Sequence, residues 1–319
     1  MANIIYTNLF EGIELFQKLK KEERIVHTPY RGKVSDNSYC FKVGMKPSNT
    51  EEYKNQLLLT IKDNFGITNH SFNEKFYQAI NGTGQEWNEL NVFHSSSLLS
   101  LLCFYNISEQ NSLDIKIAER VCTFTSCEFE VSNVIGKNKK NRPYFSYIDV
   151  KLSGSCDGKR VSLYLESKFS EYVNQRGLQK FTTTEEYKSI YSKLSGKING
   201  LDVIIEENKI LLTQTDKKRP ARYWQGIKQM VSHYLGMRNC KDNSDIVYLG
   251  EILYDFRPFI NMPFDHFGDY EDIHHQLVTA LEDMETEPQT FIVGKNILTY
   301  QDVFKNYNLD KRVRELYNL

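Results

Sequence analysis

Apolar and polar residues alternate along the middle of the chain, and this pattern predicts adjacent β-strands. The stretch 161–169 alternates regularly. Its two faces would carry Val161, Leu163, Leu165, Ser167 and Phe169 on one side, and Ser162, Tyr164, Glu166 and Lys168 on the other. Further strands are predicted over about 117–132 and 143–153, with two glycines marking a hairpin turn before residue 160. An antiparallel hairpin of this kind can place Asp149 beside Glu166.

Helical spacing of apolar residues is found on both sides of these strands. Helices are predicted over Ile4–Leu19, Glu51–Phe65, Ser95–Tyr105, 184–195 and Tyr223–Leu235. Ser95 or Ser96 is suited to cap the third of these helices, and Gly236 is suited to end the last one. Other stretches favour strands: Pro29–Pro47 (irregular or strand-like), a hairpin at Val203–Thr213, and a largely apolar strand at Ile246–Tyr254. The order predicts an α/β fold with a central mixed sheet flanked by helices.

The 319 residues are enough to bury a sizeable core. We divide the chain into an α-rich N-terminal extension (1–80), a core (81–260, with an insertion at about 176–215) and a C-terminal helical tail packed on the core (261–319). No apolar run approaches the ~20 residues of a membrane-spanning helix, and the N-terminus lacks an export signal. We therefore expect a cytoplasmic protein without a membrane partner. The six cysteines show no C-x-x-C spacing, which favours reduced thiols over a zinc site or disulfides.

The formal net charge of −1 gives no overall basic footprint for nucleic acid. The distribution of charge is more informative than the sum, because basic residues cluster in short segments. The two clusters suited to contact DNA phosphates contain Lys137, Lys139, Lys140 and Arg142, and Lys217, Lys218, Arg219 and Arg222. The alternative for each cluster is a solvated turn.

Candidate chemistry lies on the predicted hairpin, where Asp149 and the Glu166-Ser167-Lys168 segment come together. Carboxylate oxygens are the ligands that Mg²⁺ takes, and a nearby lysine can stabilise a negatively charged leaving group. Glu-x-Lys alone carries little information, because it recurs at Glu52-Tyr53-Lys54, Glu186-Tyr187-Lys188 and Glu207-Asn208-Lys209. The strand context separates the copy at 166–168 from these, and the alternative is an ordinary solvated polar face. The hairpin predicts metal-dependent phosphodiester cleavage.

These residues resemble the PD-(D/E)XK nuclease superfamily, and within it a bacterial branch of uncharacterised restriction-endonuclease-like proteins. The resemblance covers about residues 80–305. It rests on Gly82-Thr83-Gly84-Gln85-Glu86, His94-Ser95-Ser96-Ser97-Leu98-Leu99, Phe129-Glu130, Ile148-Asp149-Val150, Glu166-Ser167-Lys168-Phe169 and Leu298-Thr299-Tyr300-Gln301-Asp302-Val303-Phe304. Ile148 replaces the proline that usually precedes the aspartate in this superfamily.

The resemblance implies a restriction-endonuclease-like core that acts as a DNA endonuclease in restriction or phage defence. Mg²⁺, for which Mn²⁺ can substitute, would be held by Asp149, Glu166 and Glu86, and Lys168 would assist catalysis. Gln225 or Gln229 would orient the site, with a surface amide pair as the alternative. For Glu86 the alternative is a carboxylate that favours a helix N-terminus. An exonuclease or repair nuclease, a catalytically silent nucleic-acid-binding protein, and a homodimer that cuts both strands all stay open.

Two other groups of residues are weaker candidates. His266, His274 and His275 with Asp265 suggest a transition-metal site, but adjacent histidines on a helix point in different directions, and a polar linker is the favoured interpretation. His94 precedes three serines, yet the glycines of a nucleophile elbow are missing, so serine catalysis is not expected.

Overall fold

The computed structural model describes residues 9–30, 33–80, 89–117, 119–137, 141–169, 172, 178–182, 184–215, 224–240, 242–259, 266–285, 291–294 and 297–319. Several predicted site residues lie outside these ranges, namely Glu86, Lys139, Lys140, Lys217, Lys218, Arg219 and Arg222, as does Asp265. The side chain of Gln225 is also outside the described part of the chain.

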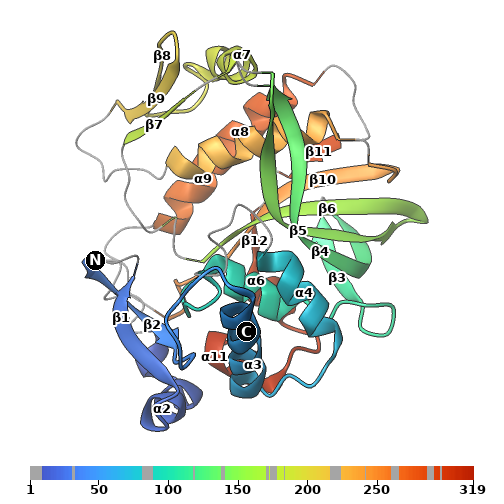
Figure 1. The fold of residues 1–319 in the computed structure, drawn as a ribbon. Helices are drawn as coiled ribbons and strands as arrows, with labels where there is room; N and C mark the ends of the chain where they lie inside the picture. Colours follow the sequence, from blue (N-terminus) through green and yellow to red (C-terminus); the bar gives the residue numbers. More distant parts are fainter. Residues whose placement is uncertain are drawn as a thin grey trace.

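A mixed β-sheet forms the centre of the protein, in the strand order β11-β10-β6-β5-β4-β3, with β12 also paired to β10 (Figure 1). The strands are β3 (Leu113–Ile117), β4 (Arg120–Lys137), β5 (Pro143–Cys156), β6 (Lys159–Lys168), β10 (Ile246–Leu253), β11 (Phe291–Val293) and β12 (Leu298–Thr299). Strands β3, β4, β5 and β6 are antiparallel to one another in turn, whereas β10 runs parallel to β6, β11 and β12. The predicted α/β fold with a central mixed sheet is therefore confirmed.

Helices cover both faces of this sheet (Figure 1). One layer contains α2 (Glu14–Lys21), α3 (Glu51–Phe65), α4 (Ser71–Ile80), α6 (Ser96–Phe104), α10 (Tyr300–Phe304) and α11 (Lys311–Tyr317). The other contains α7 (Glu185–Leu194), α8 (Trp224–Arg238) and α9 (His266–Glu282). Strand β6 separates the two cores, because Leu163 and Leu165 pack in the first cluster and Tyr164 in the second. The alternation predicted for β6 is confirmed.

Two smaller β-units lie at the periphery. Strands β1 (Ile25–Tyr30) and β2 (Lys33–Phe41) form a hairpin, which confirms strand structure within Pro29–Pro47. Strands β7 (Leu178–Thr182), β8 (Leu201–Ile205) and β9 (Lys209–Gln214) form a second sheet that includes the predicted 203–213 hairpin. Within the described ranges, no helix is both long and apolar enough to cross a membrane.

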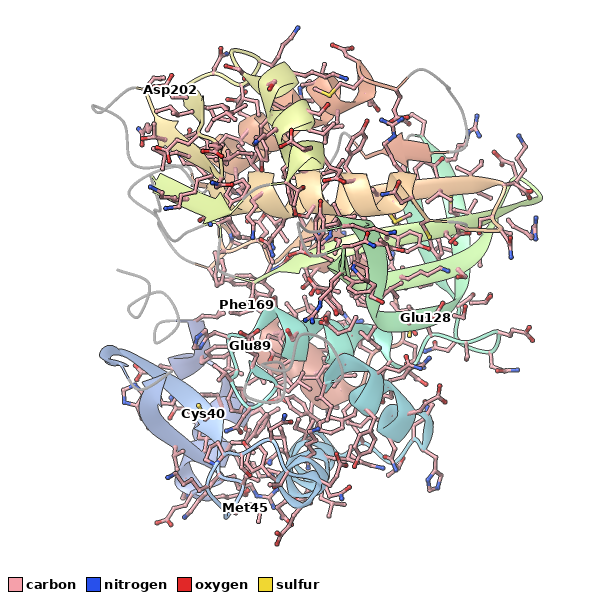
Figure 2. The ribbon with its side chains drawn as sticks, turned by 45° about the horizontal axis from the view of Figure 1, so that its top comes forward. Cys40, Met45, Glu89, Glu128, Phe169 and Asp202 are labelled. Atoms are coloured by element: carbon pink, nitrogen blue, oxygen red, sulfur yellow. The ribbon has the colours of Figure 1, made fainter. Side chains whose placement is uncertain are left out.

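The predicted division at residues 80 and 260 stays a prediction, yet one core contains residues from all three segments. Figure 2 shows Phe169, the residue after β6, in the middle of the molecule. Its ring lies 6.3 Å from that of Phe10, 4.8 Å from that of Tyr254 and 6.0 Å from that of Tyr317. The predicted helical tail also supplies β11 and β12 to the central sheet.

Two predictions about helix boundaries are wrong. Gly236 does not end a helix, because α8 continues to Arg238. A Cβ at residue 236 would lie 3.0 Å from the Cβ of Asn133 and 3.2 Å from that of Ser146, so the glycine permits close packing of α8 on β4 and β5. Residues 266–275, predicted as a polar linker, belong to α9, where His274 is buried.

The β4–β5 hairpin crosses from one core to the other at its midpoint. Val150 on β5 packs in the first cluster, whereas Ile148, two residues earlier, packs with α8 in the second. On the neighbouring strand β4, Phe129 pairs with Val150 and Val131 pairs with Ile148. Glu130, which lies between these two pairs, has a left-handed backbone conformation with φ 50°. The hairpin therefore bends where Asp149 lies.

Candidate active site

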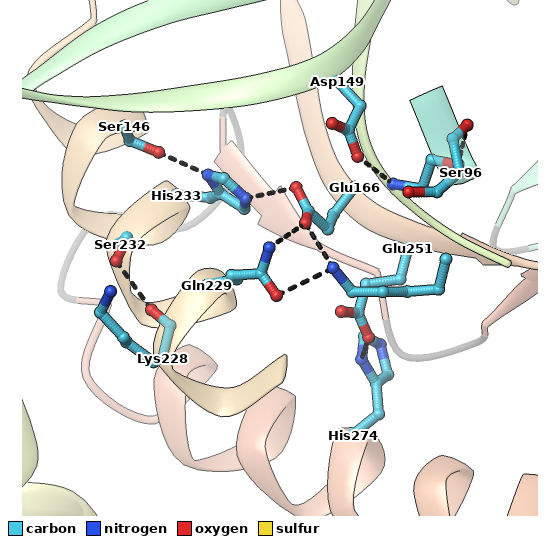
Figure 3. Close-up of polar contacts among 12 residues, drawn as sticks. Ser96, Ser146, Asp149, Glu166, Lys228, Gln229, Ser232, His233, Glu251 and His274 are labelled. Carbon is cyan, nitrogen blue, oxygen red and sulfur yellow. Dashed lines mark hydrogen bonds and ion pairs between the residues drawn. The ribbon is translucent and has the colours of Figure 1, made fainter. Parts of the chain in front are cut away.

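Glu166 and Lys168 form a buried ion pair on β6, on the face covered by α8. Their exposed fractions are 3% and 2%. The Lys168 ammonium contacts Glu166 Oε1. Gln229 of α8 bridges the pair, since its Nε2 donates to Glu166 Oε1 over 2.5 Å and its Oε1 accepts from Lys168 Nζ over 2.9 Å (Figure 3). The structure thus brings Glu166, Lys168 and Gln229 into one hydrogen-bonded group.

His233 is part of this group and was not predicted. Its Nε2 lies 2.7 Å from Glu166 Oε2, and its Nδ1 contacts Ser146 Oγ on β5 (Figure 3). Residues four apart on a helix share a face, so the spacing of Gln229 and His233 was the available signal. A histidine in a helix is too common to be chosen on spacing alone.

The surroundings of Glu166 keep it ionised at neutral pH. Burial by itself raises the pKa of this carboxyl, but the positive charge of Lys168 and the contact with His233 outweigh it and lower the pKa from 4.5 to about 2. A carboxylate offers about four acceptor positions. Lys168, Gln229 and His233 use three of them. Among the residues that the structure describes, these three contacts leave one acceptor position of Glu166 for a further donor or a cation.

Asp149 lies where β5 separates from β6. The last backbone pair of the two strands joins Val150 to Leu165, so Asp149 and Glu166 are the next residues in that register. Beyond this pair, Asp149 Oδ2 accepts the hydrogen bond of the Ser167 backbone N–H over 2.6 Å (Figure 3). The Asp149 carboxylate therefore accepts the hydrogen bond that a backbone carbonyl of β5 would accept if the strand pairing continued. Asp149 and Glu166 are therefore neighbouring positions in the sheet register, as the sequence indicated.

A second buried carboxylate, Glu251, lies beside Glu166. The parallel pairing of β6 and β10 places these two residues opposite each other, which directs both side chains to the same face. Glu251 Oε1 accepts from Tyr270 Oη over 2.9 Å, and Oε2 lies 2.7 Å from His274 Nδ1. The sequence analysis missed Glu251, because it lies within an apolar run.

The surroundings of His274 favour its protonated form. Its Nε2 faces the carbonyl oxygen of Gly294 at 3.0 Å, and its Nδ1 faces Glu251. Because both neighbours are acceptors, the ring needs a proton on each nitrogen when Glu251 is ionised. Burial lowers the pKa of His274, but Glu251 and the Gly294 carbonyl outweigh burial and raise it above 6.5. His274, which was predicted to lie in a polar linker, thus pairs with Glu251 in the protein interior.

The donor set fits a hard divalent cation through two carboxylates. Asp149 and Glu166 both offer oxygen, the ligand type that Mg²⁺ prefers. Across the described residues, no group of three or more His, Cys, Asp and Glu side chains is arranged to hold a metal ion. The third predicted ligand, Glu86, lies outside those residues.

The other Glu-x-Lys copies differ from the one on β6. Glu52 is exposed on α3, Glu186 and Lys188 are half-buried on α7, and Glu207 and Lys209 are exposed beside β9. Comparison with family models, with curated proteins and with solved structures finds no match to this chain. The arrangement of Asp149, Glu166 and Lys168 is therefore the main indication of function.

Proposed function

We propose that this protein is a metal-dependent DNA endonuclease of restriction or phage defence. The observation that carries the proposal is the buried group of Glu166, Lys168 and Gln229, with Asp149 beside it at the bend of β5. The order of elements adds support. Helix α6, antiparallel strands β4, β5 and β6, the crossover helix α8 and the parallel strand β10 follow one another as in a restriction-endonuclease-like core.

Each residue has a distinct task in this proposal. Asp149 and Glu166, with Glu86, would hold Mg²⁺, which when bound lowers the pKa of a water ligand and polarises the phosphoryl oxygens. Lys168 supplies a positive charge to the phosphate as negative charge develops on it. Gln229 and His233 fix the orientation of the Glu166 carboxylate, and Gln229 also fixes the Lys168 ammonium. Hydrolysis joins a water oxygen to phosphorus and breaks one P–O ester bond, and the leaving oxygen takes up a proton.

Cleavage of supercoiled plasmid and end-labelled linear duplex tests the proposal. We expect nicked and linear products with Mg²⁺ or Mn²⁺ and none with EDTA. Glu166→Gln and Asp149→Asn should both abolish cleavage. Glu52→Gln is the matched control, because it makes the same change in an exposed Glu-x-Lys segment of α3, and it should cleave like the wild type.

The alternatives give different results in the same assay. Products released only from ends would identify an exonuclease or repair nuclease. Cleavage that survives both Glu166→Gln and Asp149→Asn would refute the assigned site. If neither substrate is cut and calorimetry detects no Mg²⁺ binding, the endonuclease proposal fails and a catalytically silent binding protein remains.

A further inference from the structure

The outer half of the β4–β5 hairpin exposes a row of large apolar side chains. Val134 and Phe145 are direct cross-strand partners, with exposed fractions of 43% and 42%. The ring of Tyr147 lies 6.2 Å from that of Phe145, so the two aromatic residues share one face of β5. Phe145 is exposed and Tyr147 is half-buried, and neighbouring apolar side chains that reach the surface in this way are typical of surfaces that bind a partner.

The opposite face of the same hairpin segment is fixed to the protein. Ile135 and Ile148 are buried in the core with α8. Ser146 contacts His233, which in turn bonds Glu166. The exposed Phe145 and the half-buried Tyr147 are therefore held in a constant position relative to the candidate active site.

The segment of sequence that joins β4 to β5, called the basic tip below, is rich in basic residues. The segment 137–142 reads KNKKNR and contains basic residues without an acidic one. Lys137 and Arg142, the described members of this group, are exposed. A basic tip beside an aromatic row fits a polyanion that also carries flat apolar rings, and nucleic acid has this composition.

The spacing of the two aromatic residues favours an unpaired strand over a duplex. A β-strand rises about 3.3 Å per residue, so positions 145 and 147 are about 6.6 Å apart. Bases within a duplex strand are about 3.4 Å apart along the axis and are stacked on each other, whereas bases of an extended single strand can separate to accept a side chain. Asp149 follows Tyr147 at the same interval along β5.

We propose that the outer face of the β4–β5 hairpin binds an unpaired nucleic-acid strand, with Phe145 and Tyr147 stacking on successive bases and Lys137 and Arg142 contacting phosphates. This strand leads to Asp149, and the substrate class of the site is DNA with an unpaired segment. The role of the strand as substrate rests on the proposed nuclease function. The binding itself does not.

Fluorescence anisotropy in EDTA tests the binding without cleavage. The probes are a fluorescein-labelled oligothymidylate and a duplex of equal length. We expect the wild type to bind the oligothymidylate more tightly than the duplex. Phe145→Ala and Tyr147→Ala should each weaken oligothymidylate binding by at least about fivefold, since base stacking on one aromatic residue contributes that much. Leu59→Ala is the control, because Leu59 is 59% exposed on α3 and should not affect binding.

Thermal unfolding of each variant confirms that it is folded, and Phe145→Trp gives a second measurement. Its added indole should lose fluorescence when the oligothymidylate stacks on it. Wild-type affinity in both alanine variants, tighter binding of the duplex, or unchanged Phe145→Trp fluorescence would each overturn the inference. Strand binding that depends on Phe145 in a protein that neither cleaves DNA nor binds Mg²⁺ would leave the inference standing and remove the nuclease proposal. Metal-dependent plasmid cleavage together with wild-type oligothymidylate affinity in both alanine variants would do the reverse.

Discussion

Replacing Glu166 with glutamine removes a buried negative charge from between Lys168 and His233, and the structure sets the size of the effect. The pKa of Glu166 falls from 4.5 to about 2 in the folded protein. At about 1.4 kcal/mol per pKa unit, this difference corresponds to roughly 3 kcal/mol of unfolding free energy at neutral pH. Removal of one partner from a buried ion pair costs about 3–5 kcal/mol, which agrees in magnitude.

The sign of the pH dependence follows from the depressed pKa. Above pH 4.5 the carboxyl of Glu166 is ionised in both folded and unfolded states, and its stabilisation is fully present. As the pH falls from 4.5 towards 2, the unfolded state takes up a proton before the folded state does, and the stabilisation is lost. At about pH 3, the stabilisation by Glu166 is smaller by roughly 2 kcal/mol than at neutral pH. The glutamine variant lacks this titration.

Urea unfolding of wild type and Glu166→Gln from neutral pH down to about pH 3 measures the effect. The variant should be less stable by about 3 kcal/mol at neutral pH, and the gap should shrink by about 2 kcal/mol at the acidic end. Other carboxylates far from the site cancel in the difference. Glu52→Gln should differ little from wild type at every pH, because Glu52 is exposed. A gap below about 1 kcal/mol at neutral pH, or one that does not change with pH, would refute the reasoning.

Three further predictions concern other parts of the fold. The pKa of His274 is raised above 6.5 by its contact with Glu251. This contact therefore contributes stability that is fully present below pH 6.5 and is lost as the pH rises through the pKa of the folded state. Urea unfolding at several pH values should show this loss in the wild type and not in His274→Gln. Gly154→Ala would place a Cβ 2.0 Å from the backbone oxygen of Thr123 and should cost more than about 3 kcal/mol, and a variant that unfolds at the wild-type temperature would contradict this. Thr299→Ala removes a 3.1 Å cap hydrogen bond to α10 and should cost about 1 kcal/mol in thermal unfolding, whereas Thr299→Ser should retain most of the stability.

Local patterns were sufficient to predict which face of β6 each residue occupies. The period-two alternation directed Glu166 and Lys168 to one side and Leu163 and Leu165 to the other, and both assignments are confirmed. The cap of α6 was equally local, since Ser95 Oγ accepts from the N–H of the residue three positions later over 3.4 Å. Signals of this kind depend only on residues close together in the chain.

The burial of the polar face of β6 could not be predicted locally. Alternation gives the same pattern for a solvated face and for one covered by a helix. Glu166 is 3% exposed because α8, which begins at Trp224, packs over it. The same helix explains Gly236, whose role is close packing against Asn133 rather than helix termination. Such contacts join segments far apart in the chain, so they required the three-dimensional structure.

The charges gathered at this site favour a cation as its ligand. Glu166 and Glu251 are buried carboxylates in register on adjacent strands, with Lys168 and His233 beside the first and His274 beside the second. Buried charges persist in folded proteins when they are paired in this way. Asp149 adds a third carboxylate next to the group, and its Oδ2 accepts the Ser167 backbone N–H. In the proposed nuclease, a divalent cation held by Asp149 and Glu166 would add positive charge beside Lys168 and would attract a phosphate. A site that bound phosphate through Lys168 alone would set that phosphate against these carboxylates, and this favours the metal-dependent nuclease of the proposal.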